Sequence, residues 1–131
     1  MTLAERALER LQVWPDLTAV DASCGAGRAM RSVHSEILHF HSGHDVDLHL
    51  TVPAIQRIRD DLRASTAVRV VPGSRWVTVH LDCDADVDLL MSLVSMALKA
   101  HLAAVPGAVP AAGSCNLHRV TLVPRDDPDD R

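Results

Sequence analysis

Apolar and polar residues alternate between Glu36 and Leu50, and this pattern predicts a β-hairpin. The first arm covers residues 37–41, the second covers residues 45–50, and residues 42–44 form the turn. A three-residue turn pairs position 41 with 45 and position 39 with 47, which gathers alternate apolar side chains on one face. The opposite face then carries a polar set: His39, His41, Asp45, Asp47 and His49.

Helical spacing of apolar residues predicts three helices. The first covers residues 3–12 and starts from a capping box at Thr2. The second begins after Thr51, which is followed by a proline in the first turn. The last helix covers about residues 85–102, with Asp84 as its N-cap. The apolar face of the second helix consists of Ile55, Ile58 and Leu62.

Four further strands complete the expected order of elements, at residues 17–23, 28–34, 67–72 and 75–82. The first two are joined by a glycine-rich turn at residues 24–27. This order predicts an α+β fold, a mainly antiparallel sheet with helices packed on one face. The helices are expected to cover the apolar side chains of the sheet: Leu38, Phe40, Val46, Leu48, Val77 and Val79.

The composition changes after residue 104, which predicts one domain over residues 1–104 and an appendage over residues 105–131. Residues 105–113 are rich in Pro, Ala and Gly and indicate a linker. Residues 116–123 predict a short added strand, and the Asp- and Pro-rich residues 125–131 predict a disordered tail.

The net charge of −4 and the aromatic content of 2% favour neither a nucleic-acid partner nor a membrane partner. The charged N-terminus is unlike a signal peptide, and the chain is expected to be cytoplasmic. Arg is much more frequent than Lys, and both Ala and Val are abundant, as in proteins from high-GC bacteria. The three cysteines, Cys24, Cys83 and Cys115, show no C-x-x-C spacing, which argues against a disulfide framework and a thiolate zinc site.

The polar face of the hairpin has the residue types for proton transfer. In the predicted register Asp47 lies opposite His39 and Asp45 lies opposite His41, close enough for a carboxylate to orient an imidazole. If strand 75–82 is a neighbour, further side chains join this face: Trp76, Thr78 and His80. The alternative is an ordinary solvated sheet face on which these groups only meet water.

A metal site is a second hypothesis for the same face. His39 and His41 form an H-x-H pair, in which two imidazoles on one strand face can bind one ion such as zinc or iron. Spacing does not decide which residue completes the ligand set, and the candidates are His44, His49 and His80.

The motif Glu36-Ile-Leu-His39-Phe-His41, followed by Asp47 and by Trp76-Val77, resembles the luciferase family of domains. The resemblance covers about residues 5–102, and His49 and His80 do not match fixed positions of the family pattern. For the fungal member it implies oxidation of a hydroxylated α-pyrone by O₂, with neither a flavin nor a known metal.

The resemblance and the polar face together predict a small domain that binds a small acidic organic ligand and needs no cofactor. His39 and His41 would act as acid and base, with Asp47 as the orienting carboxylate. The ligand would contact the surrounding side chains: Glu36, Trp76, Thr78 and His80. Cofactor-independent oxygenation or proton transfer is the expected chemistry. The alternatives are the metal site and a non-catalytic module, for example a homodimer joined through a sheet edge.

Overall fold

A computed structural model describes residues 1–25, 27–33, 35–103 and 115–116 of the 131-residue chain. The described strands form one antiparallel sheet with the order β1-β2-β3-β4-β6-β5. Their bounds are β1 (Thr18–Asp21), β2 (Arg28–Arg31), β3 (Glu36–Phe40), β4 (Asp45–His49), β5 (Val68–Val70) and β6 (Trp76–His80). The six strands expected before residue 104 are all present; β3 is shifted by one residue, and the other five are shorter than their sequence patterns indicate.

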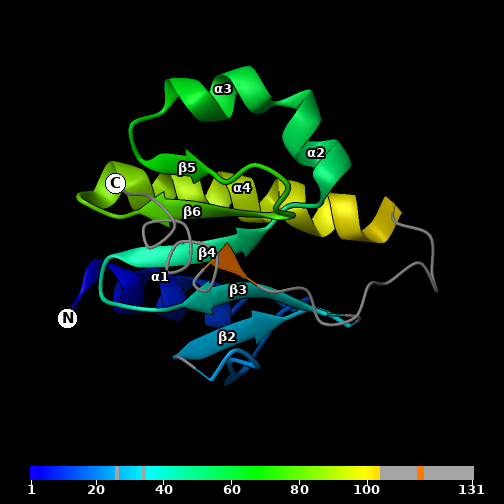
Figure 1. Cartoon of the computed structure of the whole chain (residues 1–131). Coiled ribbons are helices and arrows are strands. Elements are labelled where there is room, and N and C mark those ends of the chain that lie inside the picture. The colour runs from blue at the N-terminus through cyan, green and yellow to red at the C-terminus, as the bar shows by residue number, and fades with distance from the viewer. Residues whose placement is uncertain (26, 34, 104–114, 117–131) are drawn as a thin grey trace.

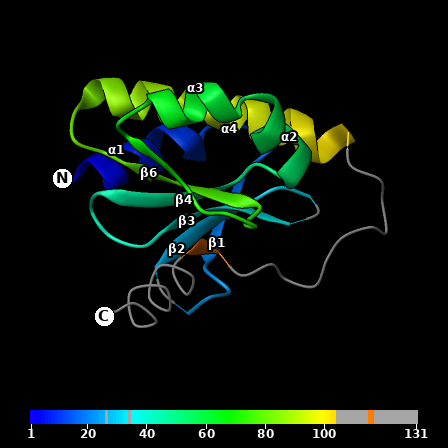
Figure 2. The same ribbon diagram turned by 45° about the horizontal axis from the view of Figure 1, so that its top comes forward.

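The described helices lie on one side of this sheet (Figures 1 and 2). They are α1 (Leu3–Gln12), α2 (Val52–Arg57), α3 (Arg59–Ala64) and α4 (Asp84–Ala103). The apolar side chains of the sheet face them, and those expected there are all buried: Leu38, Phe40, Val46, Leu48, Val77 and Val79. The α+β prediction is therefore confirmed. No helix in the described ranges is long and apolar enough to cross a membrane.

The single helix predicted after Thr51 is wrong, because α2 and α3 are separated at Ile58. Ile58 has φ −118° and ψ 22°, outside the helical region, which interrupts the regular turn. Ile55 of α2 and Leu62 of α3 are nevertheless both buried, so the break keeps each short helix's apolar side chain on the core.

The hairpin register agrees with the sequence prediction. His39 pairs with Asp47, and the His41 N–H donates to the Asp45 carbonyl over 3.2 Å. On the far side of β4, strand β6 pairs Asp47 with Thr78. The polar side chains of β3, β4 and β6 therefore share the sheet face opposite the helices, as burial of the apolar face requires.

The linker predicted at residues 105–113 and the tail predicted at 125–131 lie outside the described residues, as do positions 117–123 of the added strand. Cys115 and Asn116 are described, and both are buried. They lie against the polar face of the sheet, on the side away from the helices (Figure 2).

Gly27 fixes the turn that carries Cys24, and alanine there should destabilise the protein by at least about 2 kcal/mol. Gly27 has φ +87°, and an added Cβ would lie 2.0 Å from the Phe40 carbonyl oxygen. Gly25→Ala is the matched control, because Gly25 has φ +83° but open space around it. That variant should lose only about 1 kcal/mol. Urea unfolding measures both, and equal losses would contradict the predicted clash.

Candidate metal centre on the polar sheet face

The polar sheet face is buried rather than solvated. His39 is 1% exposed and Asp47 is 2% exposed, although both belong to the face opposite the helices. The neighbouring side chains from β4 and β6 are buried too: His49, Trp76 and Thr78. The interpretation of this face as ordinary wet sheet surface is therefore wrong for its central residues, and each buried polar atom there needs a partner.

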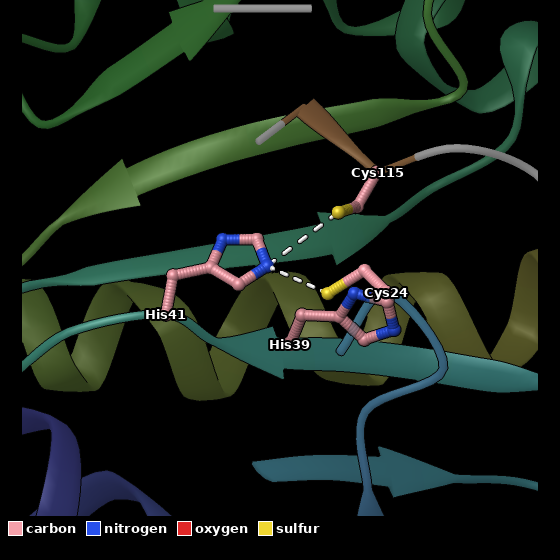
Figure 3. Close-up of side chains that lie close together, drawn as sticks. All are labelled: Cys24, His39, His41 and Cys115. Carbon is pink, nitrogen blue, oxygen red and sulfur yellow. Dashed lines mark hydrogen bonds between the residues drawn. The ribbon is translucent and has the colours of Figure 1, made fainter. Parts of the chain in front are cut away.

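Four potential metal ligands converge on this face: Cys24, His39, His41 and Cys115. One ligand atom from each lies within 4.8 Å of all the others. Figure 3 shows the side chains pointing toward one another from separate parts of the chain. Cys24 comes from the β1–β2 turn, His39 from β3, and His41 from the residue after β3. Cys115 comes from the two-residue segment described after α4.

The distances around His41 match those of a tetrahedral site. His41 Nε2 lies 3.5 Å from Cys24 Sγ and 3.5 Å from Cys115 Sγ. Bonds of about 2.3 Å from zinc to sulfur and about 2.0–2.1 Å to nitrogen place sulfur and nitrogen about 3.5 Å apart on one tetrahedral edge. The side chains therefore already have the separation that a shared ion would impose.

His39 is oriented for coordination through its other ring nitrogen. Its Nε2 lies 2.6 Å from Glu36 Oε1, which can accept the ring N–H. His39 Nδ1 is buried and has no hydrogen-bond partner among the described residues. A histidine that donates one N–H to a carboxylate and leaves its other nitrogen open has the arrangement of a metal ligand.

Glu36 is itself held in the charged form that this arrangement uses. It accepts a hydrogen bond from the Ser23 backbone N–H over 3.0 Å. Burial raises the pKa of Glu36, but the hydrogen bonds from Ser23 and His39 outweigh burial, and the net pKa lies below its ordinary value. Glu36 also links the turn preceding β2 to β3, which places Cys24 beside His39.

His41 has a second supporting carboxylate, Asp47. His41 Nδ1 lies 3.6 Å from Asp47 Oδ2. Asp47 accepts the Thr78 hydroxyl over 2.6 Å and the Asn116 backbone N–H over 2.7 Å. These bonds fix the carboxylate, which in turn favours the ring orientation that directs Nε2 at the two sulfurs.

The predicted pairing of histidines with carboxylates is wrong in detail. Asp47 lies opposite His39 in the register, yet its carboxylate is near His41, because Glu36 occupies the hydrogen-bonding nitrogen of His39. Asp45 lies opposite His41 but contacts His80 at 2.7 Å. Register fixes which backbones are neighbours, whereas side chains also reach diagonally.

Three histidines proposed as further metal ligands lie outside the four-residue cluster. The ring of His44 contacts the Leu81 carbonyl at 3.3 Å. The side chain of His80 is 50% exposed and lies between Asp45 and Asp82, and the hydrogen bond to Asp45 raises its pKa. His49 stacks on Trp76, with ring centroids 4.9 Å apart. Only His39 and His41 of the predicted histidine set therefore belong to the cluster.

The predicted ligand-binding residues divide between this site and its surroundings. Trp76 lies 4.7 Å from His39 between ring centroids and walls the site on that side. Thr78 contacts the site by its hydrogen bond to Asp47, and Glu36 by its hydrogen bond to His39. His80 lies at the exposed end of the same face.

Sequence reasoning missed Cys24, Cys115 and Asn116. The absence of C-x-x-C spacing argued against a thiolate site, but the two thiols come from distant parts of the chain and meet only in the fold. Asn116 is fully buried. Its side-chain N–H donates to the Trp76 carbonyl over 2.9 Å, and its side-chain oxygen accepts the Ser74 hydroxyl over 2.5 Å. These bonds, with the one to Asp47, fix the segment that carries Cys115.

Burial of His49 predicts a loss of stability in acid. Burial, with the charges of His101 and Arg75, lowers the pKa of His49 to about 3. Below pH 6.5 the unfolded chain binds a proton at this position that the folded chain does not bind until about pH 3, so stability falls as the pH falls between these values. At pH 5 the loss should be about 2 kcal/mol. Urea unfolding from pH 7 to 5 should show a smaller loss in His49→Gln, and parallel curves would contradict the assignment.

The fold and the site define an α+β domain with a buried Cys/His cluster on one sheet face. Residues 34–97 match the family model of the Luciferase domain. The matched segment contains His39, His41 and Asp47, whereas Cys24 and Cys115 lie outside it. Searches of curated proteins and of solved structures return no match.

Proposed function

We propose that this protein binds one transition-metal ion, zinc in the first instance, through Cys24, His39, His41 and Cys115. The observation that carries the proposal is the convergence of these four ligand atoms within 4.8 Å in a buried site. Buried polar atoms are ordinarily hydrogen-bonded, and an ion would satisfy His39 Nδ1, which has no partner in the described structure.

The chemistry of the ligands selects the class of ion. Two sulfurs and two imidazole nitrogens suit zinc or another borderline-soft ion, whereas calcium and magnesium prefer oxygen ligands. Two thiolates also balance the charge of a divalent ion, so the bound centre is neutral overall. Neutrality matters because an uncompensated charge is costly to bury at this depth.

A closed four-ligand set of this kind favours a structural role. The ion would join the β1–β2 turn, strand β3 and the segment at Cys115, three parts of the chain that lie on the polar face. Sites with four protein ligands typically contribute to folding, whereas catalytic zinc keeps a position open for water or substrate. The proposed ion would therefore hold the segment at Cys115 and Asn116 against Asp47 and Thr78.

Proton transfer to a small acidic ligand is a second candidate, which the buried contact between His41 and Asp47 favours. A carboxylate near Nδ1 would leave His41 Nε2 to act as the base in cofactor-independent proton transfer or oxygenation. This nitrogen is also the proposed metal ligand. Because one lone pair cannot serve both roles, metal loading should suppress any such activity, and the two candidates are separable by experiment.

Cobalt substitution tests the metal proposal on the intact chain. Reduced, metal-free protein titrated with Co²⁺ should develop the visible absorption of tetrahedral cobalt and a near-ultraviolet thiolate charge-transfer band, both saturating at about one ion per chain. Cys83→Ser is the matched control, because Cys83 is exposed and outside the cluster, and it should behave like the wild type. Absence of the thiolate band in folded wild-type protein would contradict the proposal.

A further inference from the structure

We propose that Cys24 and Cys115 form an oxidisable pair that a hydroperoxide converts to a disulfide, with release of the bound metal. The release step rests on the proposed metal function. The disulfide step depends only on the positions of the two thiols, and it is testable in metal-free protein.

The two sulfurs are neighbours in space although they are far apart in sequence. Each lies 3.5 Å from the same atom, His41 Nε2, and all ligand atoms of the cluster lie within 4.8 Å of one another. A disulfide needs the sulfurs about 2.05 Å apart, so the pair must close by a further movement of about 2–3 Å at most. Rotation of cysteine side chains supplies movements of this size.

The two cysteines differ in their access to solvent. Cys24 is half-buried in the β1–β2 turn, whereas Cys115 is 1% exposed. A small oxidant therefore meets Cys24 first, and Cys115 is placed to react with the oxidised product. His41 Nε2 lies beside both sulfurs, so the same short stretch of space holds the two thiols that would join.

The reaction balances with a hydroperoxide as the oxidant. The Cys24 thiolate attacks the peroxide, and an S–O bond forms as the O–O bond breaks. The leaving group takes a proton and departs as water from hydrogen peroxide, or as an alcohol from an organic hydroperoxide. The Cys115 thiolate then attacks the sulfur of the Cys24 sulfenic acid, and hydroxide leaves as water after taking a proton. Two electrons pass from the two thiolates to the peroxide, and two protons are consumed.

Disulfide formation removes both anionic ligands from the metal. The ion would retain only two neutral imidazoles, which cannot hold it against the solvent as four ligands do. The Cys24–Cys115 bond would then replace the ion as the covalent link between the β1–β2 turn and the segment at Asn116. Oxidation would thus replace the metal cross-link with a disulfide cross-link. The released ion can be measured.

Peptide mapping of the full chain tests the pair directly. Cleavage after Arg and Lys puts the three cysteines on separate peptides, residues 11–28, 76–99 and 100–119. Zinc-loaded protein treated with hydrogen peroxide should release about one zinc per chain, measured with a coloured chelator, as the 11–28/100–119 linked peptide accumulates. Dithiothreitol should reverse the link, and Cys83→Ser should respond like the wild type.

A second variant identifies the attacking cysteine. In Cys115→Ser the sulfenic acid should persist on Cys24 and be trapped by dimedone on peptide 11–28. Linkage through peptide 76–99, or peroxide treatment that leaves peptides 11–28 and 100–119 unlinked, would overturn the proposal. If the wild type takes up no zinc, the proposed metal function is wrong. Peroxide treatment of the metal-free chain still tests the disulfide step, which predicts a link between peptides 11–28 and 100–119.

Discussion

Cys115→Ser is expected to lower the affinity for zinc by about 100- to 1,000-fold, because it removes one of four ligands. Zinc sites in small domains contribute about 10–16 kcal/mol in total, so one thiolate corresponds to about 3–4 kcal/mol. Competition with a chelator of known affinity measures the change. Among single-ligand variants, Cys115→Ser should lose the most zinc affinity. Cys115 is next to Asn116, and the bound ion would help to hold that segment on the sheet.

Cys83→Ser isolates the effect of the site from the general effect of losing a thiol. Cys83 is exposed and lies within 3.7 Å of Asp86, away from the cluster. Its replacement should leave zinc affinity unchanged. Equal affinities of the wild type and Cys115→Ser, in proteins that are both folded, would show that Cys115 is not a ligand.

Asp47→Ala should destabilise the metal-free protein by about 3 kcal/mol and weaken zinc binding by about 10- to 100-fold. The substitution leaves the Thr78 hydroxyl, the Asn116 N–H and His41 Nδ1 without their buried partner. Unsatisfied buried groups account for the loss of stability. Loss of the orienting carboxylate accounts for the weaker binding. Chemical denaturation and chelator competition measure the two effects separately.

Asp45→Ala is the matched control on the same strand. Asp45 contacts His80 at 2.7 Å, but both side chains are about half exposed, 47% and 50%. Exposed ion pairs of this kind contribute less than about 1 kcal/mol, and zinc affinity should not change. If Asp45→Ala and Asp47→Ala lose the same stability, the assigned network around Asp47 is wrong.

The hairpin and its register were predictable because every second side chain of each strand faces the core and must be apolar. A register shifted by one residue would separate Leu38 and Phe40 from Val46 and Leu48, and the three-residue turn gives the register that keeps them on one face. The position of His39 on the polar face follows from this register. Its burial could not be predicted, because the segment that helps cover the face comes from distant residues.

The ligand set was only half predictable for the same reason. His39 and His41 are two residues apart on one arm, and strand periodicity alone places them together. Cys24 and Cys115 meet them through the sheet order and the Asn116 contacts, which local patterns do not encode. The choice of Glu36 over Asp47 as partner of His39 depends on side-chain direction, which register does not determine.

Elemental analysis of freshly purified, untagged protein under reducing conditions tests the central claim most directly. Wild-type protein should carry about one zinc per chain through gel filtration, and Cys24→Ser and Cys115→Ser should carry much less. His80→Ala should retain the full complement, because His80 lies outside the cluster. A folded wild-type protein that holds no stoichiometric metal, even after zinc is supplied, would contradict the account and leave proton transfer at His41 as the better explanation of the site.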